Sequence, residues 1–131
     1  MDLLDIFKAL SNRTRLDILK GLKDPAKHFP AQDEGDVNEV GVCVSSIQEG
    51  VGLSQSTVSD YLATLQRAGL VDVRRIGQWT YYKRNEANLK AFADIIGQEL
   101  SVVLAELSRP IFSTNKSVIR DIPFYRSGSH Q

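Results

Sequence analysis

The chain of 131 residues has few of the residues that build metal, redox or catalytic sites. It contains one cysteine, Cys43, and two histidines, so an internal disulfide is excluded and a zinc site made of Cys and His ligands is disfavoured. A Gly-rich phosphate loop, a His-Glu-x-x-His motif and a Gly-x-Ser-x-Gly motif are all missing. We therefore expect no enzymatic activity, no metal site and no cofactor.

Long hydrophobic runs are also missing. No apolar stretch approaches the ~20 residues that a membrane-spanning helix needs, and the chain starts with acidic residues where a signal peptide carries basic ones. With 42% hydrophobic and 24% charged residues, the composition is that of an ordinary globular protein. We expect a soluble, cytoplasmic protein without a membrane partner.

The chain has no net charge, since 16 basic residues balance 16 acidic ones. This balance excludes a protein that holds nucleic acid through bulk positive charge. The charges are nevertheless segregated, because residues 24–53 carry a net charge of −5 and residues 54–84 a net charge of +3. An acidic segment thus precedes a locally basic one.

Two short helices are predicted at the start of the chain. Their hydrophobic stripes recur at helical spacing, with Leu3, Phe7 and Leu10 in the first helix and Leu16, Leu19 and Leu22 in the second. Ser11 is the expected N-cap between them. A polar segment with Pro25 and Pro30 follows over residues 24–41. We call it the insertion, because it is long for a connection in a compact domain.

The next pattern predicts two helices joined by a tight turn. Val44, Ile47 and Val51 mark a short helix that ends at Gly52, and Ser54 is the expected N-cap of the helix that follows. Apolar residues of that second helix are Val58, Tyr61, Leu62 and Leu65, and Gly69 is expected to end it. This is the spacing of a helix-turn-helix.

A β-hairpin is predicted directly after it. Residues 71–75 and 79–83 are rich in β-branched and aromatic residues, and Ile76, Gly77 and Gln78 form the expected loop. A basic hairpin after a helix-turn-helix is typical of a wing. The predicted fold is therefore mainly α with a β-hairpin wing, a winged helix-turn-helix.

This arrangement predicts contacts with double-stranded DNA. A recognition helix reads the major groove mainly through its N-terminal residues. Gln55 is suited to adenine, Asp60 to the cytosine amino group, and the basic residues of the hairpin to phosphate or the minor groove. The expected DNA-binding residues are Ser54, Gln55, Ser56, Thr57, Ser59, Asp60, Thr64, Arg67, Arg74, Arg75, Gln78 and Lys83.

A seam of apolar residues predicts a long last helix, from about Glu86 to Leu107. Such a helix is longer than a small core needs, which favours homodimerisation over burial in the same chain. The expected dimer interface comprises Leu3, Phe7, Leu89, Phe92, Ile96, Leu100, Val103 and Leu107. We expect residues 1–107 to form the DNA-binding and dimerisation domain and residues 108–131 a C-terminal tail.

Two residues are candidate sensors. Cys43 is either a small buried hydrophobic residue or a redox-responsive thiol, and His28 lies among the acidic residues of the insertion. The insertion itself is either a spacer, an electrostatic modulator of the DNA surface or part of an effector pocket.

Several stretches resemble the ArsR/SmtB family of bacterial winged-helix repressors over about residues 5–107. They are residues 7–19 (FKALSNRTRLDIL), 52–59 (GLSQSTVS), 68–71 (AGLV) and 74–82 (RRIGQWTYY). The resemblance implies a dimer that binds operator DNA and often releases it when an inducer binds. Metal-sensing members carry a Cys-Val-Cys box, in which Cys43 here matches the first cysteine but Ser45 replaces the second. One thiolate does not reproduce a soft-metal site.

The sequence thus predicts a dimeric, sequence-specific transcriptional regulator that acts as a repressor and is released by an unidentified small-molecule or redox inducer. Two alternatives remain: a winged-helix module that binds proteins instead of DNA, and a redox-responsive regulator based on Cys43.

Overall fold

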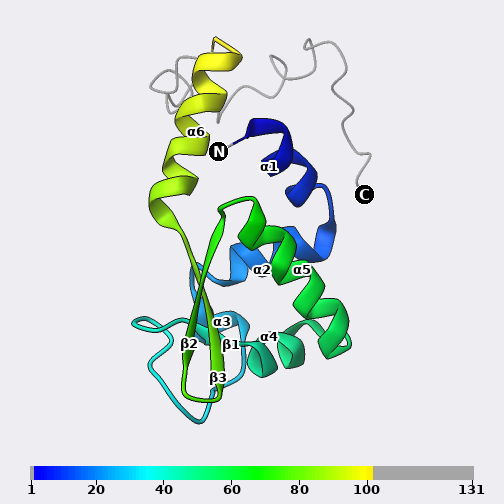
Figure 1. Ribbon diagram of the computed structural model, residues 1–131, viewed down its shortest axis with the longest axis vertical. Helices are drawn as coiled ribbons and strands as arrows, with labels where there is room; N and C mark the ends of the chain where they lie inside the picture. The colour runs from blue at the N-terminus through cyan, green and yellow to red at the C-terminus, as the bar shows by residue number, and fades with distance from the viewer. Residues whose placement is uncertain (1, 102–131) are drawn as a thin grey trace, which may run out of the picture. The chain divides into compact units, whose positions relative to one another are not determined.

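The computed structural model describes residues 2–101, and it shows a mainly helical fold with one small sheet (Figure 1). The chain divides into two compact units after Ala93, a residue within the last described helix. The elements in chain order are α1 (Leu3–Leu10), α2 (Arg13–Gly21), α3 (Pro25–His28), β1 (Val42–Cys43), α4 (Val44–Val51), α5 (Gln55–Arg67), β2 (Val71–Ile76), β3 (Trp79–Arg84) and α6 (Glu86–Glu99). The predicted winged helix-turn-helix is confirmed.

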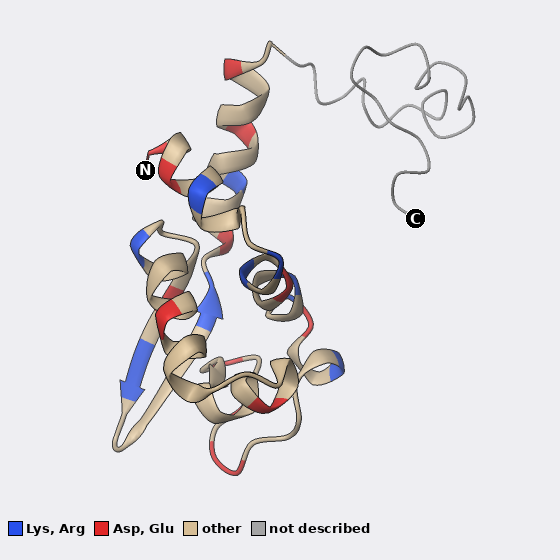
Figure 2. Ribbon diagram, turned by 90° about the vertical axis from the view of Figure 1, so that its right-hand side faces the viewer, with Lys and Arg blue, Asp and Glu red and all other residues tan. Residues whose placement is uncertain are grey.

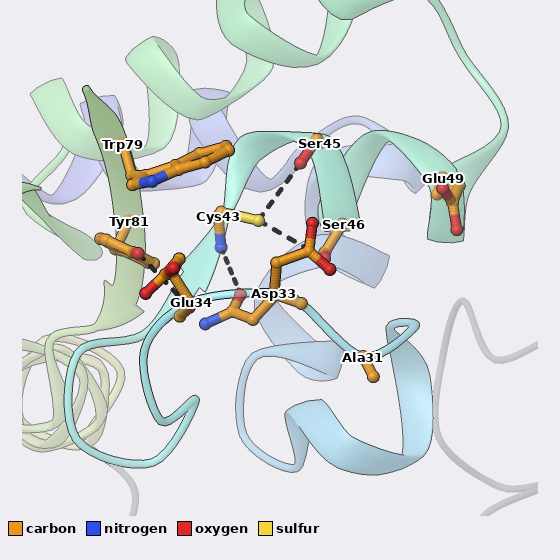
Figure 3. A pocket seen from close by; sticks show the side chains of 10 residues that line it. Ala31, Asp33, Glu34, Cys43, Ser45, Ser46, Glu49, Trp79 and Tyr81 are labelled. Atoms are coloured by element: carbon orange, nitrogen blue, oxygen red, sulfur yellow. Dashed lines mark hydrogen bonds between the residues drawn. The ribbon is translucent and has the colours of Figure 1, made fainter.

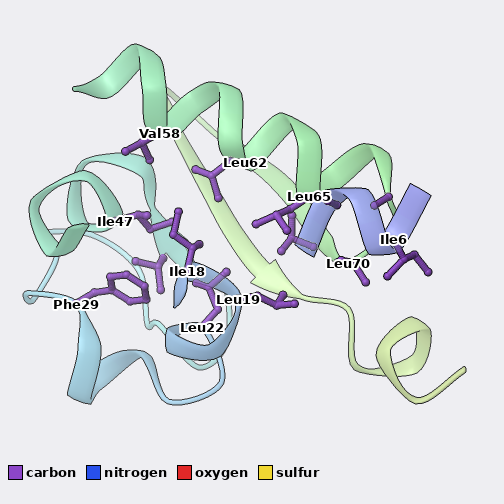
Figure 4. Packing of buried hydrophobic residues seen from close by; sticks show 14 residues of the cluster. Ile6, Ile18, Leu19, Leu22, Phe29, Ile47, Val58, Leu62, Leu65 and Leu70 are labelled. Carbon is purple, nitrogen blue, oxygen red and sulfur yellow. The ribbon is translucent and has the colours of Figure 1, made fainter. Parts of the chain in front are cut away.

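The core joins α1, α2, α4 and α5 with the segment that enters β2 (Figure 4). Ile6, Ile18, Ile47, Leu62 and Leu70 are all fully buried. Removing such side chains from water supplies about 1.5–3 kcal/mol each. These contacts fix the helix-turn-helix on the first two helices.

The first helix faces the core differently from the sequence prediction. Ile6 and Ala9 are buried, whereas Phe7 is 43% exposed and Leu3 is half-buried. In α2, Ile18 and not Leu16 is fully buried. The apolar residues cover more of each helix than one stripe needs, so spacing alone did not select the buried face.

The corner between α1 and α2 is capped by Asn12, so the prediction of Ser11 as N-cap was wrong. Asn12 Oδ1 accepts a hydrogen bond of 2.9 Å from the Arg15 amide. Ser11 instead ends α1, with its hydroxyl donating to the Lys8 carbonyl. Ser11 and Asn12 are adjacent and both residue types are good N-caps. Asn12 caps α2 because its backbone is the one with extended dihedral angles.

The sheet has three antiparallel strands in the order β1-β3-β2. The predicted hairpin is confirmed, although Ile76 and Arg84 extend its strands to six residues each and leave Gly77 and Gln78 as a two-residue turn. Gly77 has a φ of 61°, as such a turn requires. The pattern did not predict β1, whose two residues pair with Tyr82 and Tyr81.

The insertion is anchored at both of its ends. Phe29 is buried against Gly21 and Gly50, where a Cβ atom would lie 3.0 and 2.8 Å from its ring. At the other end, the Gln32 side chain accepts from the Cys43 amide at 2.8 Å and donates to the carbonyls of Gly35 and Gly41. The insertion therefore connects α2 and α4 with the sheet.

The last described helix, α6, begins after Asn85, whose side chain accepts from the Asn88 amide at 2.8 Å. It ends at Glu99, so Val103, Leu107 and the predicted tail at residues 108–131 lie outside the described residues. Within residues 2–101, no helix is long and apolar enough to cross a membrane.

Candidate nucleic-acid interface

The turn between α4 and α5 is built from Gly52, Leu53 and Ser54. Gly52 has a φ of 73° and its amide donates to the Gln48 carbonyl at 2.8 Å, which ends α4. Ser54 caps α5 by accepting from the Thr57 amide. The hydroxyl of Ser54 also donates to Thr57 Oγ1 at 2.8 Å. The start of α5 is thus held by local bonds that the sequence encodes.

One face of α5 is buried and the other lies open. Val58, Leu62 and Leu65 are fully buried, which fixes the helix against the core. At the opposite face, Gln55, Ser56 and Asp60 are exposed, and Ser59 is half-buried. The first two turns therefore present amide, hydroxyl and carboxylate groups to solvent, a set able to read base edges in the major groove.

Three predicted DNA-binding residues take part in bonds within the helix. Thr57 belongs to the cap, and Thr64 Oγ1 donates to the Asp60 carbonyl at 3.1 Å. Arg67 donates to Thr64 Oγ1 at 3.3 Å from the last turn of α5. Because α5 rises about 1.5 Å per residue, Arg67 lies about 10 Å further along the helix than Asp60.

The wing carries two exposed arginines on opposite faces. Arg74 pairs with Tyr81 across the hairpin and Arg75 pairs with Thr80. Because successive residues of a strand point to opposite sides, the two guanidinium groups leave different faces of the ribbon. Gln78 is exposed at the tip, beside the partly exposed Ile76 and Trp79.

Two further basic residues of β3 are engaged elsewhere. Lys83 Nζ donates to the carbonyls of Asn38 at 2.9 Å and Glu39 at 3.4 Å, and so it holds the insertion. Arg84 forms a two-bond ion pair with Glu86 at 2.8 and 3.0 Å, and its side chain is only 16% exposed. Arg84 thus links the end of β3 to the start of α6. Figure 2 shows red acidic segments on the insertion as well as blue basic segments on the hairpin.

The predicted dimer surface is only partly open in the described residues. Phe7 and Phe92 form an edge-to-face pair with ring centroids 5.7 Å apart. Phe92 and Leu89 also pack against the core, so part of the seam is used within the chain. Leu4, which the spacing did not select, is 65% exposed. Further along α6, Ile96 is half-buried, and Leu100 just beyond the helix is 66% exposed.

A small polar cavity of about 170 Å³ surrounds Cys43 (Figure 3). The insertion contributes Asp33 and Glu34, and β3 contributes Trp79 and Tyr81. Tyr81 is buried and its hydroxyl donates to the Glu34 carbonyl at 3.3 Å. Burial raises the pKa of the Tyr81 hydroxyl, as do the nearby Cys43 and Glu34. Tyr81 therefore packs in the sheet, as aromatic residues of a strand usually do.

The Cys43 sulfur lies 3.2 Å from Ser45 Oγ and 3.5 Å from Ser46 Oγ. Burial raises the pKa of this thiol, but the hydroxyl and backbone groups of Ser45 and Ser46 outweigh burial and leave the pKa below its ordinary value. His28 does not line this cavity and lies exposed on α3. Over residues 2–101, no three His, Cys, Asp or Glu side chains are placed to hold a metal ion.

Gln32 and Lys83 are the residues whose roles the sequence did not reveal. Both connect the insertion to the sheet through backbone groups, over separations of 11 and 45 residues. A backbone amide or carbonyl can belong to any residue type, so a side chain that bonds to one has no partner that can be recognised in the sequence. Only the length of the insertion indicated that something holds it.

The sequence is similar to known bacterial regulators. Residues 41–73, which include α4, α5 and the start of β2, match the family described as "Bacterial regulatory protein, arsR family". The uncharacterized HTH-type transcriptional regulator YbzH of Bacillus subtilis is 47% identical over 100 residues, which are 76% of this chain and all of that protein.

Two solved structures share the fold. An ArsR-like transcriptional regulator from Rhodococcus sp. RHA1 has a TM-score of 0.55 at 27% identity, covering 80% of this chain and 88% of that one. The homodimeric winged helix-turn-helix DNA-binding domain of Mb0332 from Mycobacterium bovis has a TM-score of 0.51 at 29% identity, covering 73% and 78%. The chain belongs to the ArsR family of winged helix-turn-helix transcriptional regulators.

Proposed function

We propose that the protein is a homodimeric repressor that binds operator DNA with α5 in the major groove and the wing on the flanking backbone or minor groove. The observation that carries this proposal is the exposed polar group at the start of α5, held by the Ser54 cap and by buried Val58 and Leu62. Gln55 pairs with adenine, Ser56 and Ser59 contact base edges, and Asp60 accepts from a cytosine amino group.

The dimer is supported by exposed apolar side chains on α1 and by the homodimeric Mycobacterium bovis relative. Leu4 and Phe7 are 65% and 43% exposed, and covering them removes apolar surface from water. A two-fold axis places two α5 helices about one DNA turn apart, so each protomer reads one half-site.

An inducer is proposed to act through the insertion. This segment touches α4 through Phe29 and holds β1 and β3 through Gln32, Tyr81 and Lys83. A ligand that moves it displaces the helix-turn-helix relative to the wing, which lowers DNA affinity. The dimer is thereby released from its operator.

The wing arginines give the test of DNA binding. A duplex is first selected from a random library, and its affinity is then measured by fluorescence anisotropy across salt concentrations. We expect Arg74→Ala and Arg75→Ala to differ, because their side chains leave opposite faces of the hairpin. The variant that removes a phosphate-binding cation should bind more weakly to all sequences, with a salt slope smaller by about 0.9 for each phosphate that is no longer neutralised.

Lys90→Gln is the control, because it removes one exposed charge from α6 outside the wing. If neither arginine variant differs from this control, the wing does not bind the DNA backbone. If no duplex is selected and the parent is not retained on heparin at low salt, the winged helix is a protein-binding module.

The thiol of Cys43 favours a second candidate, a redox-responsive regulator. Ser45 and Ser46 favour the thiolate, so rising pH should populate it in the folded protein before it does so in the unfolded chain. The pH midpoint of alkylation by iodoacetamide should lie below that of the urea-unfolded protein, in which Cys43 is an ordinary thiol. A midpoint at or above that of the urea-unfolded protein contradicts the prediction.

A second experiment compares the DNA affinity of the protein before and after alkylation of Cys43. We expect alkylation to weaken DNA binding in the parent, because the added group occupies the cavity between the insertion and β3, beside Trp79 and Tyr81. Cys43→Ser should bind DNA normally and be insensitive to the reagent. Equal affinity of the alkylated and untreated parent would leave Cys43 with a purely structural role.

A further inference from the structure

A second hollow, of about 440 Å³, lies where the C-terminal half of α5 meets α1 and α2. Its lining includes three basic side chains, Lys8 from α1, Arg15 from α2 and Arg67 from α5, together with the hydroxyl-bearing Thr64. Asp5 is the one acidic residue of the lining. The fold brings these bases together from three separate helices. Thr64 and Arg67 are predicted DNA-binding residues, but they line this hollow and lie further along α5 than the base-reading residues of its first two turns.

Arg15 is held rigidly at the edge of this hollow. Its Nε donates to the Ala9 carbonyl at 2.6 Å and its Nη2 to the Lys8 carbonyl at 3.2 Å. The guanidinium also lies over the Tyr61 ring, 5.4 Å from its centroid. A guanidinium has five N–H donors, so donors remain after the two that satisfy the end of α1.

Lys8 and Arg67 are the more available cations. Neither they nor Arg15 belongs to any of the ion pairs formed within residues 2–101. Lys8 and Arg67 are exposed. Within residues 2–101, the only side-chain bond that Arg67 makes is the one to Thr64. The hollow thus combines one fixed cation, two adjustable ones and a hydroxyl.

We propose that this hollow binds a phosphate-type anion. Arginine and lysine form their strongest hydrogen bonds with phosphate and carboxylate oxygens, and a concave basic surface concentrates such anions. Two sources supply this chemistry: a backbone phosphate of DNA outside the half-site read by α5, or a free phosphorylated small molecule. The DNA source rests on the function proposed above, whereas the free anion does not.

The test uses the double variant Lys8→Gln/Arg67→Gln, which leaves the structural Arg15 in place. Lys20→Gln/Lys90→Gln is the matched control, because it also removes two exposed positive charges and neither residue lines the hollow. Circular dichroism checks that all proteins fold. Pyrophosphate binding is measured by calorimetry, and duplex binding by anisotropy with long and with trimmed flanks.

The double variant should bind pyrophosphate at least about tenfold more weakly than the parent and the control, since two charged hydrogen-bond donors are removed. If DNA is the source, the variant also binds the long duplex more weakly, with a salt slope smaller by about 0.9 for each phosphate that is no longer neutralised, and matches the control on the trimmed one. If a free anion is the source, both duplexes bind equally and pyrophosphate changes DNA affinity in the parent and the control but not in the double variant.

The proposal is overturned if the double variant and the control bind both pyrophosphate and the long duplex alike. Failure of the proposed DNA interface is a separate result, because pyrophosphate binding can still be measured when the parent binds no duplex. Arg67→Gln alone provides the same comparison if the double variant does not fold.

Discussion

Gly41→Ala should destabilise the protein much more than Gly52→Ala, although both glycines adopt a positive φ. Gly41 has a φ of 99° and Gly52 a φ of 73°. An alanine in this region costs roughly 1–2 kcal/mol through its own backbone. A Cβ atom on Gly52 meets nothing within 4 Å, whereas one on Gly41 collides with the carbonyl group of Tyr82.

The collision at Gly41 is with backbone atoms and not with a flexible side chain that could move aside. Tyr82 belongs to β3 and pairs with Val42, so its carbonyl group moves only if β1 separates from the sheet. Misplaced atoms in packed regions cost about 1–3 kcal/mol, which adds to the cost of the backbone conformation. We expect a total of about 2–5 kcal/mol for Gly41→Ala and about 1–2 kcal/mol for Gly52→Ala.

Urea unfolding of the two variants and the parent measures this difference. A change in midpoint at constant slope reports stability, and a changed slope reports an altered folded or unfolded state. Equal losses of stability for the two variants would mean that the approach of Gly41 to Tyr82 is easily relaxed. The insertion would then be held by its side-chain bonds alone.

The same variant separates stability from regulation. Gly41 lies between the insertion and β1, and its carbonyl accepts from Gln32. If the insertion transmits an inducer signal to the wing, a folded Gly41→Ala protein should keep the α5 surface but lose the coupling. Its DNA affinity would then no longer respond to an inducer that releases the parent.

The parts of the fold that the sequence predicted correctly are those specified locally. The α5 helix carries its own cap at Ser54, its own buried stripe and its own stop near Gly69. The hairpin likewise carries a Gly-containing turn between two β-rich runs. Such signals act over a few residues, so the position of the candidate DNA surface followed from them.

The parts that were missed depend on distant partners. The β1 strand has two residues, too few for any alternation, and it exists because Tyr81 and Tyr82 offer a free edge. Lys83 was expected at DNA because it is basic, and the sequence did not predict that it donates to carbonyls some 45 residues away. In α1, burial of Ile6 instead of Phe7 depends on how α2 and α5 pack against it.

Gln55→Ala should weaken operator binding and also change which sequences bind best. Gln55 is the first residue of α5 and is exposed, in the place from which a recognition helix reaches base edges. A glutamine that pairs with adenine through two hydrogen bonds supplies about 1–3 kcal/mol of discrimination at that position. In a two-fold dimer the loss occurs in both half-sites, which corresponds to about 2–6 kcal/mol for the whole operator.

Gln66→Ala is the matched control, because it removes the same exposed side chain from the last turn of the same helix. Anisotropy with operators substituted at each base pair distinguishes the two variants. We expect Gln66→Ala to keep the order of preference of the parent, whereas Gln55→Ala tolerates any base where the parent requires adenine. Since a base contact carries sequence information and a phosphate contact does not, the salt slope should stay unchanged in both. If Gln55→Ala keeps the base preferences of the parent, α5 reads DNA from another position, and the exposed hydroxyl and carboxylate groups of Ser56 and Asp60 become the next residues to replace.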